Sequence, residues 1–326
     1  MNDARRDEGQ GPGQAQGAEQ QARRGLLLGV AAYAAWGIVP LYWRELKGVD
    51  PTEILACRAL FGLGTFVVLA AVMGQLGNAV AALRRPRTLA ILAAAAALLS
   101  INWGLFIHAT LGGHLLQASL GYFINPLLSV ALGVVFLGER LRRLQLVAIV
   151  LAAAGVGWLA IGAGPPWIAL TLAASFGVYG LLRKTAPVAA LAGSTVETAL
   201  MAPLAVGYLG WIAADPARGA FAHDGVRVHA LLAGTGLVTA LPLLWFTAAA
   251  RRLPLSTIGF LQYLAPTGQF LTAVLVFGEP LAARKLVAFG FIWAALVVFS
   301  VDLRRAALRS GAGPGAGIPS RSTVPE

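Results

Sequence analysis

The chain has little charge and almost no cysteine. Only 12% of its 326 residues are charged, against about 25% in an average soluble domain, which excludes an ordinary soluble fold. The single cysteine, Cys57, excludes an intramolecular disulfide and a multi-cysteine metal site. The sequence holds no Walker A motif, no His/Cys/carboxylate cluster and no Ser/His/Asp set. We therefore expect no metal, no cofactor, no enzyme activity and no ATP-driven pumping by this chain alone.

Long apolar runs fill the chain instead. Hydrophobic residues make up 58% of it, and ten segments are long enough to cross about 30 Å of hydrocarbon at about 1.5 Å per residue. They cover residues 26–43, 53–74, 88–109, 114–137, 144–162, 166–182, 191–212, 229–249, 254–277 and 283–303. The fold class predicted is an all-α integral membrane protein with ten transmembrane helices. Residues 1–25 and 306–326 are polar and are expected to be disordered tails.

One displacement of 140 positions maps the first half of the chain onto the second. It carries Leu115–Leu141 onto Leu255–Leu281 and aligns Pro126 with Pro266. Because each half has five crossings, an odd number, the second half must lie inverted relative to the first. We predict two inverted five-helix repeats, residues 26–163 and 164–305, which is an architecture of secondary transporters with a site near the midplane.

The positive charge of the chain lies in short gaps between the apolar segments. The net charge is +11, but the basic residues form no face or stripe, so we expect no nucleic-acid partner. With the amino terminus in the cytoplasm, 18 Lys and Arg residues fall on the inner side and 6 on the outer side. This asymmetry predicts that both termini are cytoplasmic.

Several motifs resemble one known family. They are AAYAAWGIVPLYW (31–43), EILACR (53–58), NWGLFI (102–107), QASLGYFINPL (117–127), FLGERLRRLQ (136–145), FTAAARRLPLSTIGFLQYLAPT (246–267) and KLVAFGFIWAAL (285–296). Over about residues 24–305 the chain resembles the RarD-type permeases of the EamA group of the drug/metabolite transporter superfamily. The resemblance implies a ten-helix protein of the bacterial cytoplasmic (inner) membrane and favours export. Cys57 stands where that family commonly has His, so a proton role for this position is not carried over.

Polar residues of the fourth and ninth segments are the first candidates for a substrate pathway. Tyr122, Asn125 and Ser129 recur at helical spacing and share one face. The displacement maps this face onto Gln262, Ala265 and Gln269. The alternative is that these polar side chains only join helices to one another.

Three prolines are candidates for helix breaks: Pro40, Pro126 and Pro266. A proline inside a helix lacks an N–H and clashes with the carbonyl group four residues earlier. We expect kinked helices in the fourth and ninth segments, with freed carbonyls that coordinate a ligand or accept hydrogen bonds from neighbouring helices.

Two charged residues lie inside predicted spans. Arg58 is shallow enough to snorkel to the headgroups, so a structural role stands beside a functional one. Glu197 lies near the inner side, where a short carboxylate snorkels poorly. The two positions are about 13 Å apart in depth, which disfavours a direct ion pair. Our hypothesis places them at the outer and inner ends of one pathway, and retained transport by Arg58→Ala and Glu197→Gln variants would remove it.

The remaining pathway candidates are aromatic or polar residues of four segments: Tyr33, Trp36, Asn102, His108, Gln117 and Tyr263. For Tyr33 and Trp36, close helix packing stands beside an aromatic wall for substrate. For His108, an interface role is favoured over a proton carrier. Glu139 and Glu279 lie in connections, where we expect each to cap and orient the next helix.

These features predict a secondary transporter that moves a small organic metabolite or drug-like solute by alternating access. The expected partners are this small-molecule substrate and membrane lipids. Proton coupling through Glu197, solute exchange, facilitated diffusion and a homodimer are all left open. An integral-membrane enzyme acting on lipid or isoprenoid substrates is the alternative, and it predicts a polar catalytic cluster at an interface. A receptor or scaffold predicts extended soluble loops.

Overall fold

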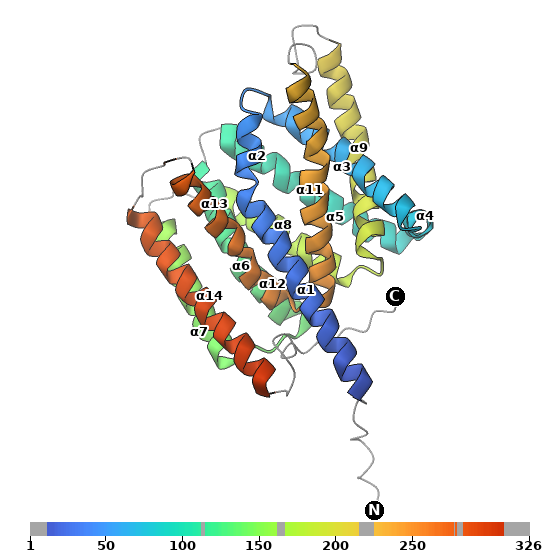
Figure 1. Ribbon diagram of the computed structural model, residues 1–326. Helices are drawn as coiled ribbons and strands as arrows, with labels where there is room; N and C mark the ends of the chain where they lie inside the picture. Colours follow the sequence, from blue (N-terminus) through green and yellow to red (C-terminus); the bar gives the residue numbers. More distant parts are fainter. Residues whose placement is uncertain are drawn as a thin grey trace, which may run out of the picture.

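Figure 1 shows the computed structural model, a bundle of helices. The structure describes residues 12–111, 115–161, 167–214, 225–276, 278 and 283–309, and no strand occurs among them. In hydrocarbon a helix satisfies all of its own backbone groups, so apolar runs of this length fold as helices. The helices are α1 (Pro12–Ile38), α2 (Pro40–Glu45), α3 (Pro51–Val72), α4 (Leu76–Leu83), α5 (Pro86–Leu111), α6 (Leu115–Leu137), α7 (Arg143–Ala160), α8 (Trp167–Thr185), α9 (Ala190–Ala213), α11 (Val226–Arg252), α12 (Leu255–Gln262), α13 (Leu264–Leu275) and α14 (Ala283–Arg309).

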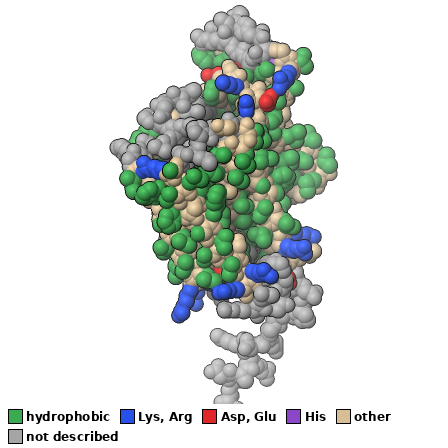
Figure 2. Space-filling view, turned by 60° about the vertical axis from the view of Figure 1, so that its left-hand side comes forward, with side chains coloured by type: hydrophobic (Ala, Val, Ile, Leu, Met, Phe, Trp, Pro, Cys, Tyr) green, Lys and Arg blue, Asp and Glu red, His purple; other side chains and the backbone are tan. Residues whose placement is uncertain are grey.

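Seven of the described helices are long and apolar enough to cross a membrane, fewer than the ten crossings predicted. Three predicted segments fall outside the seven. In α6 the apolar stretch is the shorter Gly121–Leu137, and α8 carries Arg183 and Lys184 in its last turn. The ninth segment is divided into α12 and α13. Figure 2 shows a broad hydrophobic surface with Lys and Arg gathered toward its two ends, as expected of a protein that spans a bilayer.

The described ends of the chain lie at the same end of the bundle. α1 begins and α14 ends at the bottom of the view in Figure 1, whereas α2 lies near the top. We call these the lower end and the upper end of the bundle.

The three proline positions behave differently. α1 ends at Ile38 and Pro40 opens α2, as proline favours the first position of a helix. The ninth segment breaks at Tyr263, three residues before Pro266, which lies in the first turn of α13. α6 runs through Pro126 without ending, so no helix break occurs there. Neighbouring helices and side chains can satisfy the backbone group that such a proline frees.

Small residues set the closest helix contacts. A Cβ atom on Gly236 of α11 would lie 2.5 Å from the backbone of Phe61 in α3, so only glycine fits this crossing. Close backbone approach at small residues is the usual packing mode in lipid. The contact fixes α3 against α11, the two helices that carry Arg58 and Thr239.

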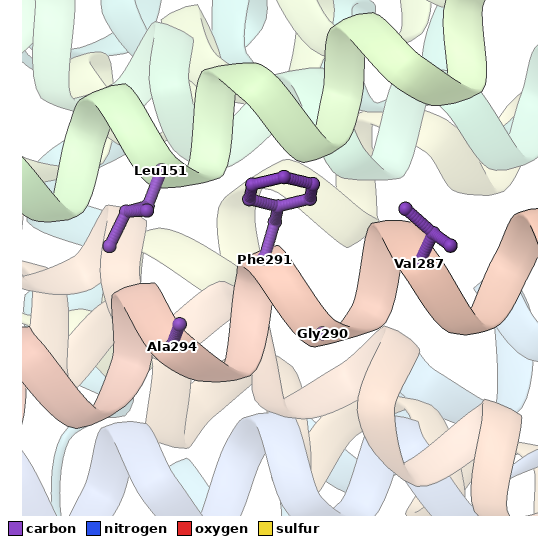
Figure 3. A pocket seen from close by; sticks show the side chains of 5 residues that line it. All are labelled: Leu151, Val287, Gly290, Phe291 and Ala294. Atoms are coloured by element: carbon purple, nitrogen blue, oxygen red, sulfur yellow. The ribbon is translucent and has the colours of Figure 1, made fainter.

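A shallow apolar groove lies between α7 and α14 at the edge of the bundle. Figure 3 shows Leu151 of α7 facing Val287, Gly290, Phe291 and Ala294 of α14. None of these five residues has a side chain that hydrogen bonds. The groove therefore offers no means of recognising a polar solute.

Candidate functional site

Five aromatic rings from α1, α8 and α11 form a cluster inside the bundle. They belong to Tyr33, Trp36, Phe176, Tyr179 and Phe246, and the contacting ring centroids are 5.3 to 6.1 Å apart. Most of the contacts are edge-to-face or tilted, the arrangement that the ring quadrupoles favour. Tyr33, Tyr179 and Phe246 are buried, whereas Trp36 and Phe176 are only partly so. We call these rings the central aromatic cluster.

Arg58 lies on the α2 side of the bundle and is held by three other helices. Its guanidinium carbon is 5.0 Å from the ring centroid of Trp43 in α2 and 4.7 Å from that of Trp103 in α5. Its Nε donates a hydrogen bond of 3.0 Å to Thr239 Oγ1 in α11. A cation over an aromatic face is stabilised by the ring quadrupole. Arg58 therefore turns toward rings and a hydroxyl group of the bundle.

Tyr122 of α6 neighbours this arginine. The two side chains are close enough to interact electrostatically, and the Tyr122 ring contacts that of Phe106 with 5.7 Å between centroids. Tyr122 keeps 37% of its surface exposed, although the next residues on α6, including Phe123 and Asn125, are buried. Arg58 itself is half-buried, so neither side chain is fully enclosed by the described residues.

Ser129 of α6 faces α12, and the α6 backbone also accepts a hydrogen bond from Tyr263. Gln262 Nε2 donates to Ser129 Oγ at 2.9 Å, and the Tyr263 hydroxyl donates to the Phe123 carbonyl oxygen at 3.4 Å. Asn125 Oδ1 and Gln262 Oε1 are buried and have no hydrogen-bond partner within the described part of the chain. Buried polar atoms are rarely left unpaired. Ser129 therefore joins helices, while Asn125 and Gln262 each keep a free acceptor.

Gln269 of α13 hydrogen bonds to the break between α1 and α2. Its Nε2 donates to the Trp36 carbonyl oxygen at 3.2 Å. This is the carbonyl group that loses its helical partner because Pro40, four residues later, has no N–H. A side chain of the second half thus satisfies a backbone group freed in the first.

Asn102 joins α5 to α8. Its Nδ2 donates to the Leu172 carbonyl oxygen and to Ser175 Oγ, both at 2.9 Å, and the residue is buried. Both amide hydrogens are used, so its donors are committed to holding the two helices together.

Glu197 forms a buried ion pair with Arg183. Their charged atoms are 3.3 Å apart, and neither side chain has any exposed surface. The Tyr179 hydroxyl donates to the second carboxylate oxygen at 3.3 Å, which links the pair to the central aromatic cluster. A Cβ on Gly193 of α9 would collide with the guanidinium group, so this glycine leaves room for it. Glu197 and Arg58 are not paired with each other.

Glu139 caps a helix of the other half of the chain. Its carboxylate accepts from the backbone N–H groups of Leu255 and Ser256 at 2.5 and 2.9 Å, and from Ser256 Oγ at 2.6 Å. The expectation that Glu139 caps the next helix, α7, is therefore wrong, since it caps α12. Lys184 donates to the Leu253 carbonyl oxygen at 2.5 Å. The link between α11 and α12 is thus held from both sides.

Three of the residues singled out in the sequence lie beyond the described part of the structure. The side chains of His108 and Gln117, and the whole of Glu279, lie outside the described residues.

Comparison with known proteins identifies the family of this chain. A model of the EamA-like transporter family matches residues 23–161. Protein RarD of Streptomyces exfoliatus is 46% identical over 309 residues, covering 94% of this chain and 98% of that protein. Protein RarD of Escherichia coli (strain K12) is 44% identical over 284 residues, covering 87% and 96%. The chain belongs to the RarD-type permeases of the EamA family.

Other relatives agree with this assignment. An uncharacterized transporter of Vibrio cholerae is 46% identical to this RarD-type permease over 285 residues, covering 87% of this chain and 94% of that protein. A solved structure titled only "Crystal structure of protein" has a TM-score of 0.65 at 18% identity, covering 86% of this chain and 99% of that chain. That likeness concerns the fold alone. The permease is thus a multi-pass bacterial membrane protein of a transporter family.

Several residues of the permease's site carry no direct signal in the sequence. Arg183 directly follows the predicted segment 166–182, which places it in a connection, yet it is fully buried. Trp43 and Thr239 were not singled out as partners of Arg58. One clue to Trp43 as a partner of Arg58 is present in the sequence. Trp43 ends the predicted segment 26–43, and Arg58 lies near the start of the next segment, so the two residues are expected at the same end of the bundle.

Proposed function

We propose that this RarD-type permease is a secondary transporter that moves a small organic solute across the bacterial cytoplasmic membrane by alternating access. One observation carries the proposal: aromatic and polar side chains from both halves of the chain converge inside the bundle. The central aromatic cluster combines α1 with α8 and α11, and the Ser129–Gln262 bond joins α6 to α12. Sites between two repeats are typical of secondary transporters.

Two inverted five-helix repeats, residues 26–163 and 164–305, are part of the proposal. The starts of the helices support it, since α6, α7 and α5 begin 140 residues before α12, α14 and α11. Gly138 and Gly278 also correspond, and they have φ angles of 64° and 66°, a region that favours glycine.

Helix contacts support the repeat as well. α1 packs on α11 and α13, and the corresponding α8 packs on α5 and α6. α3 packs on α11 as α9 packs on α5, while α3 and α9 pack on each other. Helix pairs related by the displacement of 140 positions thus make equivalent contacts.

The proposed topology has ten crossings, with α6, α8 and the α12–α13 pair added to the seven long helices. Both termini are placed in the cytoplasm. Two facts support this: the described ends of α1 and α14 lie at one end of the bundle (Figure 1), and basic residues are biased toward the corresponding connections.

Export of the solute is proposed on the family resemblance. One Pseudomonas aeruginosa relative, 35% identical over 289 residues and covering 86% of this chain and 95% of that protein, bears the name "Chloramphenicol-sensitive protein RarD". We take amphenicols from it only as compounds to be tested.

Counterflow in proteoliposomes tests the proposal. The purified protein is reconstituted, loaded with an unlabelled solute and assayed for uptake of the same labelled solute, using amino acids, organic acids and amphenicols. Assays with and without a pH gradient test proton coupling. We expect saturable counterflow of at least one class, absent from protein-free liposomes. Failure of every class to exchange would contradict transport and favour a receptor or scaffold.

A further inference from the structure

The guanidinium group of Arg58 uses only part of its hydrogen-bond donors among the described residues. Its Nε donates a hydrogen bond to Thr239, and its Cζ lies over the rings of Trp43 and Trp103. The two terminal nitrogens, Nη1 and Nη2, donate no hydrogen bond to the residues that the structure describes. These nitrogens form the fork that matches a carboxylate in a bidentate manner.

No carboxylate of the described chain is paired with Arg58. Five carboxylates are committed elsewhere: Glu197 pairs with Arg183, Asp302 with Arg142 and Glu45 with Arg227, while Glu139 caps α12 and Asp50 caps α3. Among the described residues, the guanidinium group of Arg58 is contacted by rings and a hydroxyl group and by no carboxylate.

An arginine in this setting is costly without an anion. Charged side chains inside membrane bundles pair with one another or mark a substrate or ion pathway. Arg183 illustrates the first case, because it is fully buried and Glu197 neutralises it. Arg58 is half-buried and interacts electrostatically with Tyr122, which keeps 37% of its surface exposed.

The surroundings of Arg58 also limit what the rest of a ligand can be. Four rings are linked to Arg58: those of Trp43 and Trp103 lie over the guanidinium, Tyr122 interacts with it electrostatically, and the Phe106 ring contacts that of Tyr122. Aromatic walls with a few polar groups bind apolar and aromatic bodies. A strongly hydrated, compact anion would gain little from such walls.

We infer that Arg58 binds the carboxylate of the transported solute, and that this solute is a small organic monocarboxylate with an aromatic or apolar body. This inference rests on the proposed transport function and names its substrate class. Arg58 is the positive anchor, Thr239 holds its Nε, and the four rings contact the apolar body.

Paired acids and amides test the inference in the purified full-length protein. Calorimetric Kd values are measured for phenylacetate, 3-phenylpropionate and indole-3-acetate, and for the three corresponding amides, which have the same shape without the charge. We expect at least one acid to bind about tenfold or more tightly than its amide, since hydrogen bonds to charged groups are about twice as strong as neutral ones. The inference is overturned if no acid binds, or if acid and amide bind equally.

Three variants test whether Arg58 causes the preference for the acid over the amide. Arg58→Gln should reduce the acid-to-amide ratio to about one, whereas Arg58→Lys, which keeps the charge but loses the fork, should retain part of it. Arg227→Gln is the matched control, because it removes an arginine from an exposed ion pair with Glu45, and it should keep the wild-type ratio. An unchanged ratio in Arg58→Gln would overturn the assignment. Because the ratio is measured within one variant, partial misfolding does not imitate the expected result.

Counterflow of the same six compounds separates the two proposals. If wild-type proteoliposomes exchange neutral solutes but none of the acids, the carboxylate inference fails and the transport function stands. If the acids bind through Arg58 but no solute is exchanged, the transport function fails and the binding site stands.

Discussion

Arg183 and Arg58 are two arginines inside one apolar bundle, and their surroundings differ. Arg183 has no exposed surface and pairs with Glu197 at 3.3 Å. Arg58 is half-buried between the rings of Trp43 and Trp103, and no ion pair with it occurs among the described residues. The first arginine joins α8 to α9 as a neutralised pair. The second keeps a charge that a solute can use.

The two arginines lie in corresponding parts of the proposed repeats. The displacement of 140 positions relates Trp43 to Arg183 and Cys57 to Glu197. The second half thus has a cation and a carboxylate where the first half has a ring and a thiol. Breaking a fully buried pair leaves an unpaired charge, whereas removing an unpaired cation leaves none. The two sites should therefore respond to mutation in opposite ways.

Substitution of the buried pair should have the largest effect. Glu197→Ala leaves Arg183 buried without an anion and should lower the free energy of unfolding by about 3–5 kcal/mol. Thermal unfolding or SDS titration of the purified protein measures the loss. The double variant Arg183→Leu/Glu197→Leu should recover most of it, because replacing both charges leaves neither unpaired. Wild-type stability in Glu197→Ala would show that the pair is not the stabilising contact described here.

The helix contact beside Arg58 should come second. Gly236→Ala places a Cβ 2.5 Å from the backbone of Phe61 and should lower the free energy of unfolding by about 1–3 kcal/mol through overpacking. It should also weaken counterflow by shifting Thr239 away from Arg58. Gly62→Ala is the control on the facing helix, since nothing lies within 4 Å of its added Cβ. Equal effects of the two substitutions would argue against the close crossing.

Arg58 should affect transport and leave stability nearly unchanged. Arg58→Gln removes no ion pair, so the free energy of unfolding should stay within about 1 kcal/mol of wild type. Counterflow of an acid substrate should fall about tenfold or more, because the bidentate donor is lost. Stability and counterflow are measured on the same preparation. A variant that is as unstable as Glu197→Ala, yet transports normally, would reverse the roles assigned to the two arginines.

The cap at the lower end should contribute less to stability than the buried pair or the close helix crossing. Glu139→Gln weakens the charged cap on the N-terminus of α12 and should lower the free energy of unfolding by about 0.5–2 kcal/mol. Glu45→Gln removes an exposed pair with Arg227 and should change it by less than about 1 kcal/mol. Thermal unfolding compares the two variants. A larger loss in Glu45→Gln would contradict the importance of the cap.

The family and the helical class could be predicted from the sequence, because long apolar runs and the RarD-type motifs are local features. The partners of the charged residues could not. Glu139 caps α12 at Leu255 and Ser256, 116 and 117 residues away, and no local pattern specifies such a contact. Arg183 follows an apolar run and looks like a connection residue, but its long side chain reaches Glu197 on the next helix. Proline alone did not set the breaks, since α6 continues through Pro126.

Side-specific labelling tests most directly whether the two halves lie inverted in the membrane. In a Cys57→Ser background, Arg143→Cys and Ala283→Cys place single thiols at the starts of α7 and α14, 140 positions apart. Intact cells and inside-out vesicles are then treated with a membrane-impermeant maleimide. The inverted arrangement predicts that position 143 reacts only from the cytoplasmic side and position 283 only from the outside. Reaction of both positions from the same side would contradict it.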